Sequence, residues 1–282
     1  MTEQMMTVNG VRLCVETFGR AADPAILLIH GACASMLWWE EEFCAQLAAA
    51  GRYVIRYDQR DTGRATSWPA GAPTYGLRDL ARDAVGILDE LAIARAHVVG
   101  RSMAGAEALI LATDYADRVA TVTFACTTPG AGPDGTELPG MSPEFLDIVP
   151  DEPAGSSDAD IVTFIVEVLR AYEGGTDRFD EGAARARAVR DLARSAAIDS
   201  TLTNHFCIAL DGPECGGFDT ITAPTLVIHG ERDPVFPLEH GRALATMVAG
   251  AKLLTLPDVG HEIPPRSWPR VVAGLVAHTD DR

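Results

Sequence analysis

Residues 97–105 read HVVGRSMAG, and this stretch decides the fold class. A short apolar run leads into the pentapeptide of residues 100–104 (GRSMA), and a stretch with helical spacing follows it. A Gly-x-Ser-x-small pattern between a strand and a helix is typical of a sharp turn that exposes the serine hydroxyl. So tight a turn needs small residues two before and two after the serine, and Gly100 and Ala104 meet that condition. The pattern therefore predicts a nucleophile, Ser102, at the carboxyl end of a buried strand.

Segments with two different hydrophobic periods alternate on either side of this stretch. Continuous apolar runs predict buried strands at residues 25–29, 52–57, 97–99, 120–126, 225–229 and 252–256. Apolar residues at three- and four-residue steps predict helices at residues 38–50, from an N-cap at Thr74 to Leu91, and at residues 104–119, 239–248 and 268–278. Since right-handed crossovers place helices on both faces of a parallel sheet, the alternation predicts an α/β fold with a mostly parallel central sheet.

The alternation is interrupted between residues 129 and 219, where no strong strand pattern occurs. Two stretches of this segment, residues 160–172 and 179–197, have helical spacing. We therefore expect a core formed by residues 1–128 and 220–282, with a helical cap, or lid, inserted at residues 129–219. Insertions of about this length are usually functional.

Charge and cysteine usage narrow the classes of partner. Lys and Arg number 23 and Asp and Glu number 40, which gives a net charge of −17. Nucleic acid and anionic membrane surfaces are bound through cationic contacts, so we expect neither as a partner. The six cysteines form no CxxC pair, and the first residues resemble no secretory signal. No apolar stretch is long enough to cross a bilayer. These features lead us to expect a soluble, cytoplasmic protein.

Two further segments supply a base and an acid for Ser102. His261 follows the last predicted strand, so its loop lies at the same edge of the sheet as the serine. Asp233 follows the strand at residues 225–229, and Pro234 behind it constrains the turn. A serine needs a base to take its proton, and the imidazole needs an acid to hold its tautomer. The chain order Ser102, Asp233, His261 fits nucleophile, acid and base, with Glu231 as the rival acid.

The remaining elements of the predicted site are less specific. The main-chain N–H groups of Met103 and of Ala32, which follows the strand at residues 25–29, are the expected oxyanion-hole donors, each worth about 3 kcal/mol in the transition state. The candidate substrate-binding side chains are Cys33, Met36, Phe145, Phe164 and Phe236. We expect no metal and no cofactor, because the metal-like group of His205, Cys207 and Cys215 lacks a spaced fourth ligand.

Over nearly its whole length the sequence resembles the α/β-hydrolase superfamily, in the branch with a helical cap. The blocks RYDQRDTGR (56–64), AHVVGRSM (96–103), APTLVIHGERDP (223–234) and VGHEIPP (259–265) look most like the aclacinomycin methylesterase group of actinobacterial polyketide-tailoring enzymes. The resemblance places the family's serine, acid and histidine on Ser102, Asp233 and His261, and its oxyanion donors on Ala32 and Met103. Ala104 replaces a glycine that is more usual in the motif.

These observations predict a serine hydrolase that cleaves a carboxylic ester of a small, partly apolar, polyketide-type molecule through an acyl-enzyme. The same three residues could also serve a lactone or C–C bond hydrolase or a cofactor-free haloperoxidase. A non-enzymatic ligand receptor on this fold is a more remote alternative. The expected partner is a small-molecule ester, and the sequence leaves a homodimer open.

Overall fold

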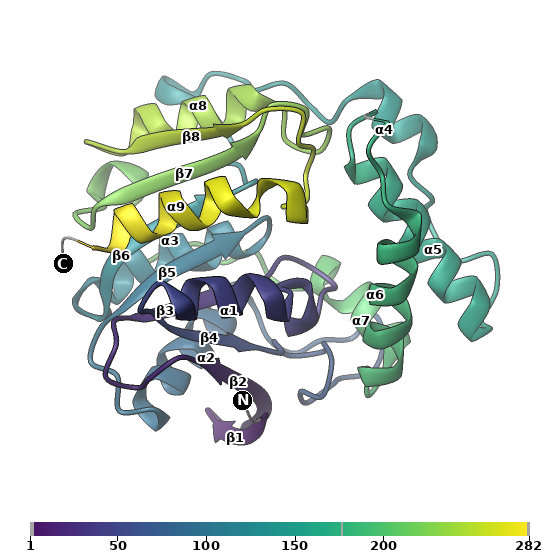
Figure 1. The fold of residues 1–282 in the computed structure, drawn as a ribbon, viewed down its shortest axis with the longest axis horizontal. Helices are drawn as coiled ribbons and strands as arrows, with labels where there is room; N and C mark the ends of the chain where they lie inside the picture. The colour runs from purple at the N-terminus through teal and green to yellow at the C-terminus, as the bar shows by residue number, and fades with distance from the viewer. Residues whose placement is uncertain (1–2, 176, 281–282) are drawn as a thin grey trace.

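The computed structural model describes residues 3–175 and 177–280, which form an eight-stranded sheet flanked by helices (Figure 1). The strands are β1 (Gln4–Val8), β2 (Val11–Phe18), β3 (Ala25–Ile29), β4 (Tyr53–Tyr57), β5 (Ala96–Arg101), β6 (Val119–Ala125), β7 (Thr225–Gly230) and β8 (Lys252–Leu256). Their order in the sheet is β1-β2-β4-β3-β5-β6-β7-β8. Strands β3 to β8 pair in parallel, whereas β1 and β2 are antiparallel to their neighbours. The predicted α/β fold with a mostly parallel sheet is confirmed.

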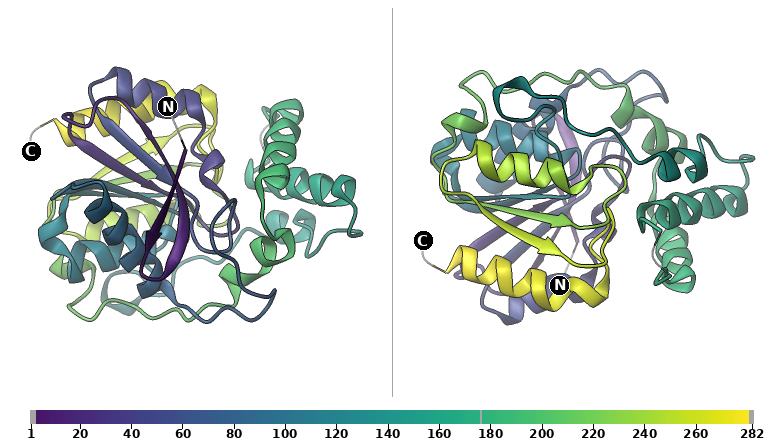
Figure 2. Two further views of the ribbon diagram at one scale, coloured as in Figure 1. Left: turned by 90° about the horizontal axis from the view of Figure 1, so that it is seen from below. Right: turned by 90° about the horizontal axis from the view of Figure 1, so that it is seen from above.

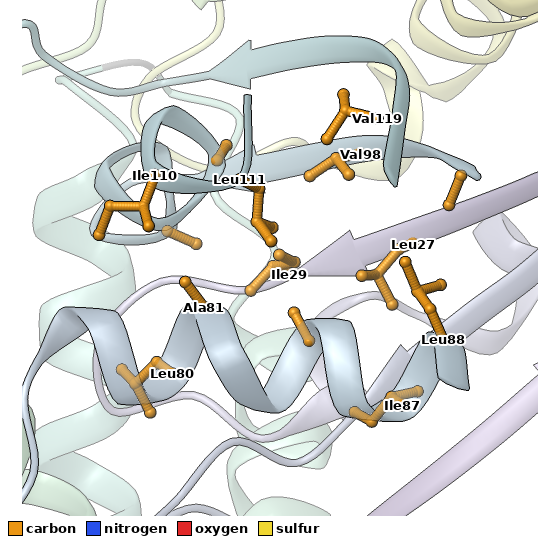
Figure 3. Close-up of a cluster of buried hydrophobic side chains, with 14 of the residues drawn as sticks. Leu27, Ile29, Leu80, Ala81, Ile87, Leu88, Val98, Ile110, Leu111 and Val119 are labelled. Carbon is orange, nitrogen blue, oxygen red and sulfur yellow. The ribbon is translucent and has the colours of Figure 1, made fainter. Parts of the chain in front are cut away.

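Helices cover both faces of the sheet (Figure 2). One face carries α1 (Glu41–Ala49) and α9 (Trp268–Thr279), and the other carries α2 (Leu77–Glu90), α3 (Ala104–Asp114) and α8 (Leu238–Met247). Figure 3 shows part of the second layer, where Leu80 of α2 and Ile110 of α3 lie on the side of the sheet to which Leu27 of β3 points. All five residues of β3 are buried, as expected of a central strand covered on both faces.

Four helices lie between β6 and β7 in the sequence and gather at one end of the sheet, on the right in Figure 1. They are α4 (Pro143–Ile148), α5 (Asp158–Tyr172), α6 (Glu181–Arg194) and α7 (Ile198–Thr203). Helices α5 and α6 pack on each other through a small apolar cluster of their own. The following stretch returns to the core, since the Leu77 amide donates to the Ala209 carbonyl and Phe218 packs on Phe124. We use the term cap for α4–α7.

The structure differs from the sequence-based expectations in local features. Strands β1 and β2 form an antiparallel hairpin at one edge of the sheet, which the apolar pattern did not predict. Helix α2 begins at Leu77 rather than after Thr74, because the Asp79 carboxylate accepts a hydrogen bond from the Gly76 amide and closes the helix start there. The described residues include no helix long and apolar enough to span a membrane.

One buried carboxyl group in the core is a source of pH-dependent stability. Glu107 of α3 is fully buried, and neither carboxyl oxygen has a hydrogen-bond partner among the described residues. Burial raises the pKa of Glu107 well above its ordinary value, and the nearby charge of Asp83 acts in the same direction. The folded state therefore keeps a proton that the unfolded state releases. Stability from this group is fully present below the unfolded-state pKa and is lost as the pH rises toward the folded-state pKa.

We expect Glu107→Gln to raise the thermal stability at pH 8, because the glutamine never ionises. The melting temperature should increase by about 2 °C or more at pH 8, and by less at pH 5. Thermal unfolding followed by circular dichroism at both pH values tests this, with Glu90→Gln on the exposed side of α2 as the matched control. A Glu107→Gln protein that melts lower than the parent at both values would contradict the prediction.

Candidate active site

A sharp turn between β5 and α3 carries Ser102. Its φ angle is +53°, in the left-handed region where side chains are strained, so the surrounding structure must hold the turn. A Cβ atom at Gly31 would lie 2.7 Å from the Cβ of Ser102, and one at Gly100 would collide with the Ala104 carbonyl. These close approaches explain why small residues are needed here. The alanine at position 104 is fully buried and fits without a glycine.

The structure brings Ser102, His261 and Asp233 together in one hydrogen-bonded row. The Nδ1 atom of His261 lies 2.9 Å from Oδ2 of Asp233, and its Nε2 atom lies 3.1 Å from Oγ of Ser102. Because a carboxylate only accepts hydrogen bonds, Nδ1 carries the imidazole proton. The lone pair of Nε2 therefore faces the serine hydroxyl, which donates to it. This geometry suits proton transfer from the serine to the histidine.

The Asp233 carboxylate is fixed by main-chain donors. The amides of Val235 and Phe236 each donate to its Oδ1 atom at 2.9 Å. Burial opposes ionisation of Asp233, but His261 and these hydrogen bonds hold its pKa below the ordinary value. The carboxylate therefore stays charged and can stabilise a protonated His261. Glu231, the rival acid in the sequence, is exposed and makes no contact of this kind.

The loop after β3 places the Ala32 amide next to the sharp turn that carries Ser102, which we call the elbow. Within residues 3–175 and 177–280, the main-chain amides of Ala32 and Met103 have no hydrogen-bond partner. The following residue, Cys33, has a φ of +62°, and its amide donates to Nδ1 of His205 at 3.1 Å. The Nε2 atom of His205 donates to the Arg60 carbonyl at 2.8 Å. Both nitrogens of His205 are thus engaged in holding this loop, and burial lowers its pKa, which favours the neutral ring.

Arg101, the residue before the serine, connects several parts of the site. Its guanidinium contacts Nε2 of His30 at 2.6 Å, the His261 main-chain carbonyl at 2.6 Å and the Glu262 carboxylate. Burial and the charge of Arg101 hold the pKa of His30 well below its ordinary value, so His30 accepts from Arg101 as a neutral ring. Arg187 of the cap lies 3.6 Å from Glu262. The loop that carries His261 is therefore linked both to the elbow and to the cap.

A cavity of about 610 Å³ lies between the cap and the core, with Ser102 and His261 in its wall. Most of its lining is apolar, and the principal side chains are Phe145, Phe164, Ile165, Val168, Leu202 and Phe236. A cavity of this size and character is suited to a drug-sized, partly apolar ligand.

Most of the predicted substrate-binding residues line this cavity. Cys33, Phe145, Phe164 and Phe236 line it. Met36 does not, because its side chain is fully buried beneath the loop and its amide donates to Asp58. That part of the prediction is corrected.

Sequence reasoning missed other residues that line the cavity. Tyr172 packs its ring edge-to-face on the imidazole of His261, with ring centroids 4.9 Å apart. His205, which the sequence offers only as part of a metal-like group, also lines the cavity. The indole of Trp38 donates to Asp191 of α6 at 2.8 Å, which joins the core to the cap. None of these contacts has a sequence signal, because each joins segments more than 85 residues apart.

Comparison with known proteins agrees with this architecture. A family model described as the alpha/beta hydrolase fold matches residues 24–265. The chain belongs to the α/β-hydrolase family. This α/β-hydrolase is similar in fold to an enol-lactonase from Burkholderia xenovorans LB400, with a TM-score of 0.76 and 22% identity over 99% of this chain and 100% of the other.

Two relatives that match nearly the whole chain at greater sequence identity are named methylesterases. The α/β-hydrolase is 33% identical to rhodomycin D methylesterase DauP of Streptomyces sp. (strain C5), over 99% of this chain and 98% of the relative. It is 32% identical, with the same coverage, to rhodomycin D methylesterase DnrP of Streptomyces peucetius. The expected resemblance to the methylesterase group is confirmed over nearly the whole chain.

Proposed function

We propose that this α/β-hydrolase is a serine esterase that cleaves a carboxylic ester, specifically a methyl ester of a partly apolar, polyketide-type small molecule. One observation carries the proposal: the hydrogen-bonded row of Asp233, His261 and Ser102 opens into a large apolar cavity. The named methylesterases among its relatives support the choice of ester, and the strongly acidic chain favours an uncharged or cationic substrate over a polyanion.

The proposed reaction has two halves. His261 takes the proton of Ser102 as its oxygen attacks the ester carbonyl, and the amides of Ala32 and Met103 donate to the oxyanion that forms. Collapse of this intermediate breaks the bond to the alkoxy group, which leaves as an alcohol with the proton from His261. Water then attacks the acyl-enzyme with the same base, and releases the acid and the free serine. Asp233 holds the imidazole and stabilises its cationic form.

Product analysis tests the reaction class. The purified protein is incubated with aryl-substituted methyl esters and with lactones of similar size, and the products are identified by mass spectrometry. We expect methanol and the free acid from the methyl esters, at rates well above those of lactone opening. Lactone hydrolysis with no methyl-ester hydrolysis would favour the alternative reaction class, and ligand binding without turnover would favour a receptor.

The contacts of Arg101 predict a loss of rate when this residue is changed to lysine. A lysine keeps the charge but cannot bridge His30, the His261 carbonyl and Glu262 at once. We expect kcat to fall by about tenfold to a hundredfold, because small displacements of a catalytic base have effects of this size. Steady-state kinetics with a methyl ester measures the change.

The control for this prediction is Arg52→Lys. Arg52 is also buried, and it donates to Thr279, to the Val276 carbonyl and to Asp280, away from the cavity. Both variants should melt at a lower temperature, but only Arg101→Lys should lose activity. Equal kcat values for the two variants would contradict the role of Arg101 in holding His261.

A further inference from the structure

Tyr172, the last residue of α5, is held against the catalytic base by three contacts. Its main-chain carbonyl accepts a hydrogen bond from the His261 amide at 2.8 Å. Its ring packs edge-to-face on the imidazole, and it stacks on Phe145 with ring centroids 5.8 Å apart. The ring of Tyr172 is therefore fixed in the wall of the cavity, next to the histidine that contacts Ser102.

The hydroxyl of Tyr172 differs from the other polar groups around it. His205 uses both of its nitrogens within the protein, Asp191 accepts from Trp38, and Thr201 donates to the Asp61 carbonyl. Among the described residues, the Tyr172 hydroxyl makes no hydrogen bond, and its oxygen is not one of the fully enclosed polar atoms. Tyr172 lines a largely apolar cavity, and its hydroxyl is a donor without a partner among the described residues, which is costly in such surroundings.

We propose that Tyr172 is a substrate-binding residue whose hydroxyl donates a hydrogen bond to a ketone or hydroxyl oxygen in the acyl part of the ester. This inference rests on the proposed esterase function and names a feature of its substrate. We expect this oxygen on the part of the acyl group nearest the scissile carbonyl, since the ring of Tyr172 contacts the same imidazole that contacts the serine. Burial raises the pKa of Tyr172, so its hydroxyl stays protonated and serves as a donor.

The variant Tyr172→Phe tests this proposal, because it removes the hydroxyl and keeps the ring that packs on His261 and Phe145. Two esters are compared, methyl 3-oxo-3-phenylpropanoate and methyl 3-phenylpropanoate, which differ by the ketone oxygen. For each ester the variant is compared with the wild type, so the intrinsic reactivities of the esters cancel. We expect kcat/KM to fall by about tenfold or more for the keto ester and by less than about twofold for the plain ester.

Two results would overturn the proposal: an equal loss on both esters, which points to a general effect on the catalytic groups, or no loss on either. Tyr172→Leu, which removes the ring as well as the hydroxyl, serves as the control for ring packing and should also lower the rate with the plain ester, which Tyr172→Phe leaves nearly unchanged.

A failure of the proposed esterase function can be distinguished from a failure of the proposal for Tyr172. If the wild type hydrolyses neither ester, the binding of both esters to the wild type and to Tyr172→Phe is measured by calorimetry. About tenfold weaker binding of the keto ester alone would still support the role of the hydroxyl. The absence of any such difference, including the absence of binding, would overturn it.

Discussion

Ser102→Ala is expected to lower kcat for ester hydrolysis by about 10⁴-fold or more, with the fold retained. The reason is that no other side chain of the described site offers a hydroxyl to the Nε2 atom of His261, and loss of the nucleophile in a serine triad has effects of this order. Release of p-nitrophenol from p-nitrophenyl acetate, together with methyl-ester turnover, measures the loss.

The integrity of this variant is checked by thermal unfolding. Alanine tolerates the left-handed φ of +53° about as well as serine does, so the melting temperature should change little. A variant that folds normally and keeps activity within tenfold of the wild type would contradict the assignment of Ser102 as nucleophile.

Asp233→Asn is expected to have the second-largest effect, a fall in kcat of about 10⁴-fold at neutral pH. The asparagine amide is isosteric with the carboxylate, and the amides of Val235 and Phe236 still have an oxygen to bind. Its NH₂ group then faces Nδ1 of His261 and favours the tautomer with the proton on Nε2. In that tautomer the histidine has no lone pair for the proton of Ser102.

The control for this variant is Glu231→Gln, since Glu231 was the rival acid and is exposed two residues away. Its kcat should stay close to that of the wild type. Steady-state kinetics of the two variants with one methyl ester decides between the two carboxylates. A large loss in Glu231→Gln with near-normal activity in Asp233→Asn would reverse the assignment.

The parallel core and the three site residues could be predicted because local chemistry determines them. The elbow requires small residues around Ser102. Buried central strands consist of continuous apolar runs, such as residues 25–29. Once these strands were recognised, the carboxyl ends of parallel strands had to share one edge of the sheet. His261 and Asp233 follow two such strands, so their proximity to Ser102 could be expected without coordinates.

The cavity could not be predicted in the same way. Tyr172 contacts His261 because α5 ends against the loop that carries the histidine. The helical spacing of residues 160–172 does not indicate which part of the core the end of this helix contacts. Met36 looked like a pocket residue by type, but the loop after β3 turns its side chain into the core. The hairpin of β1 and β2 was missed because neither strand is a continuous apolar run: β1 carries exposed residues at the edge of the sheet, and Arg12 and Glu16 interrupt the apolar residues of β2.

The most direct test of the account is covalent labelling with a serine-reactive fluorophosphonate, followed by peptide mapping with tandem mass spectrometry. The account predicts one adduct, on the Oγ atom of Ser102, formed at least about 10²-fold more slowly in His261→Ala because the serine then lacks its base. An adduct on another residue, or labelling of Ser102 at the same rate in both proteins, would contradict the claim that His261 activates Ser102.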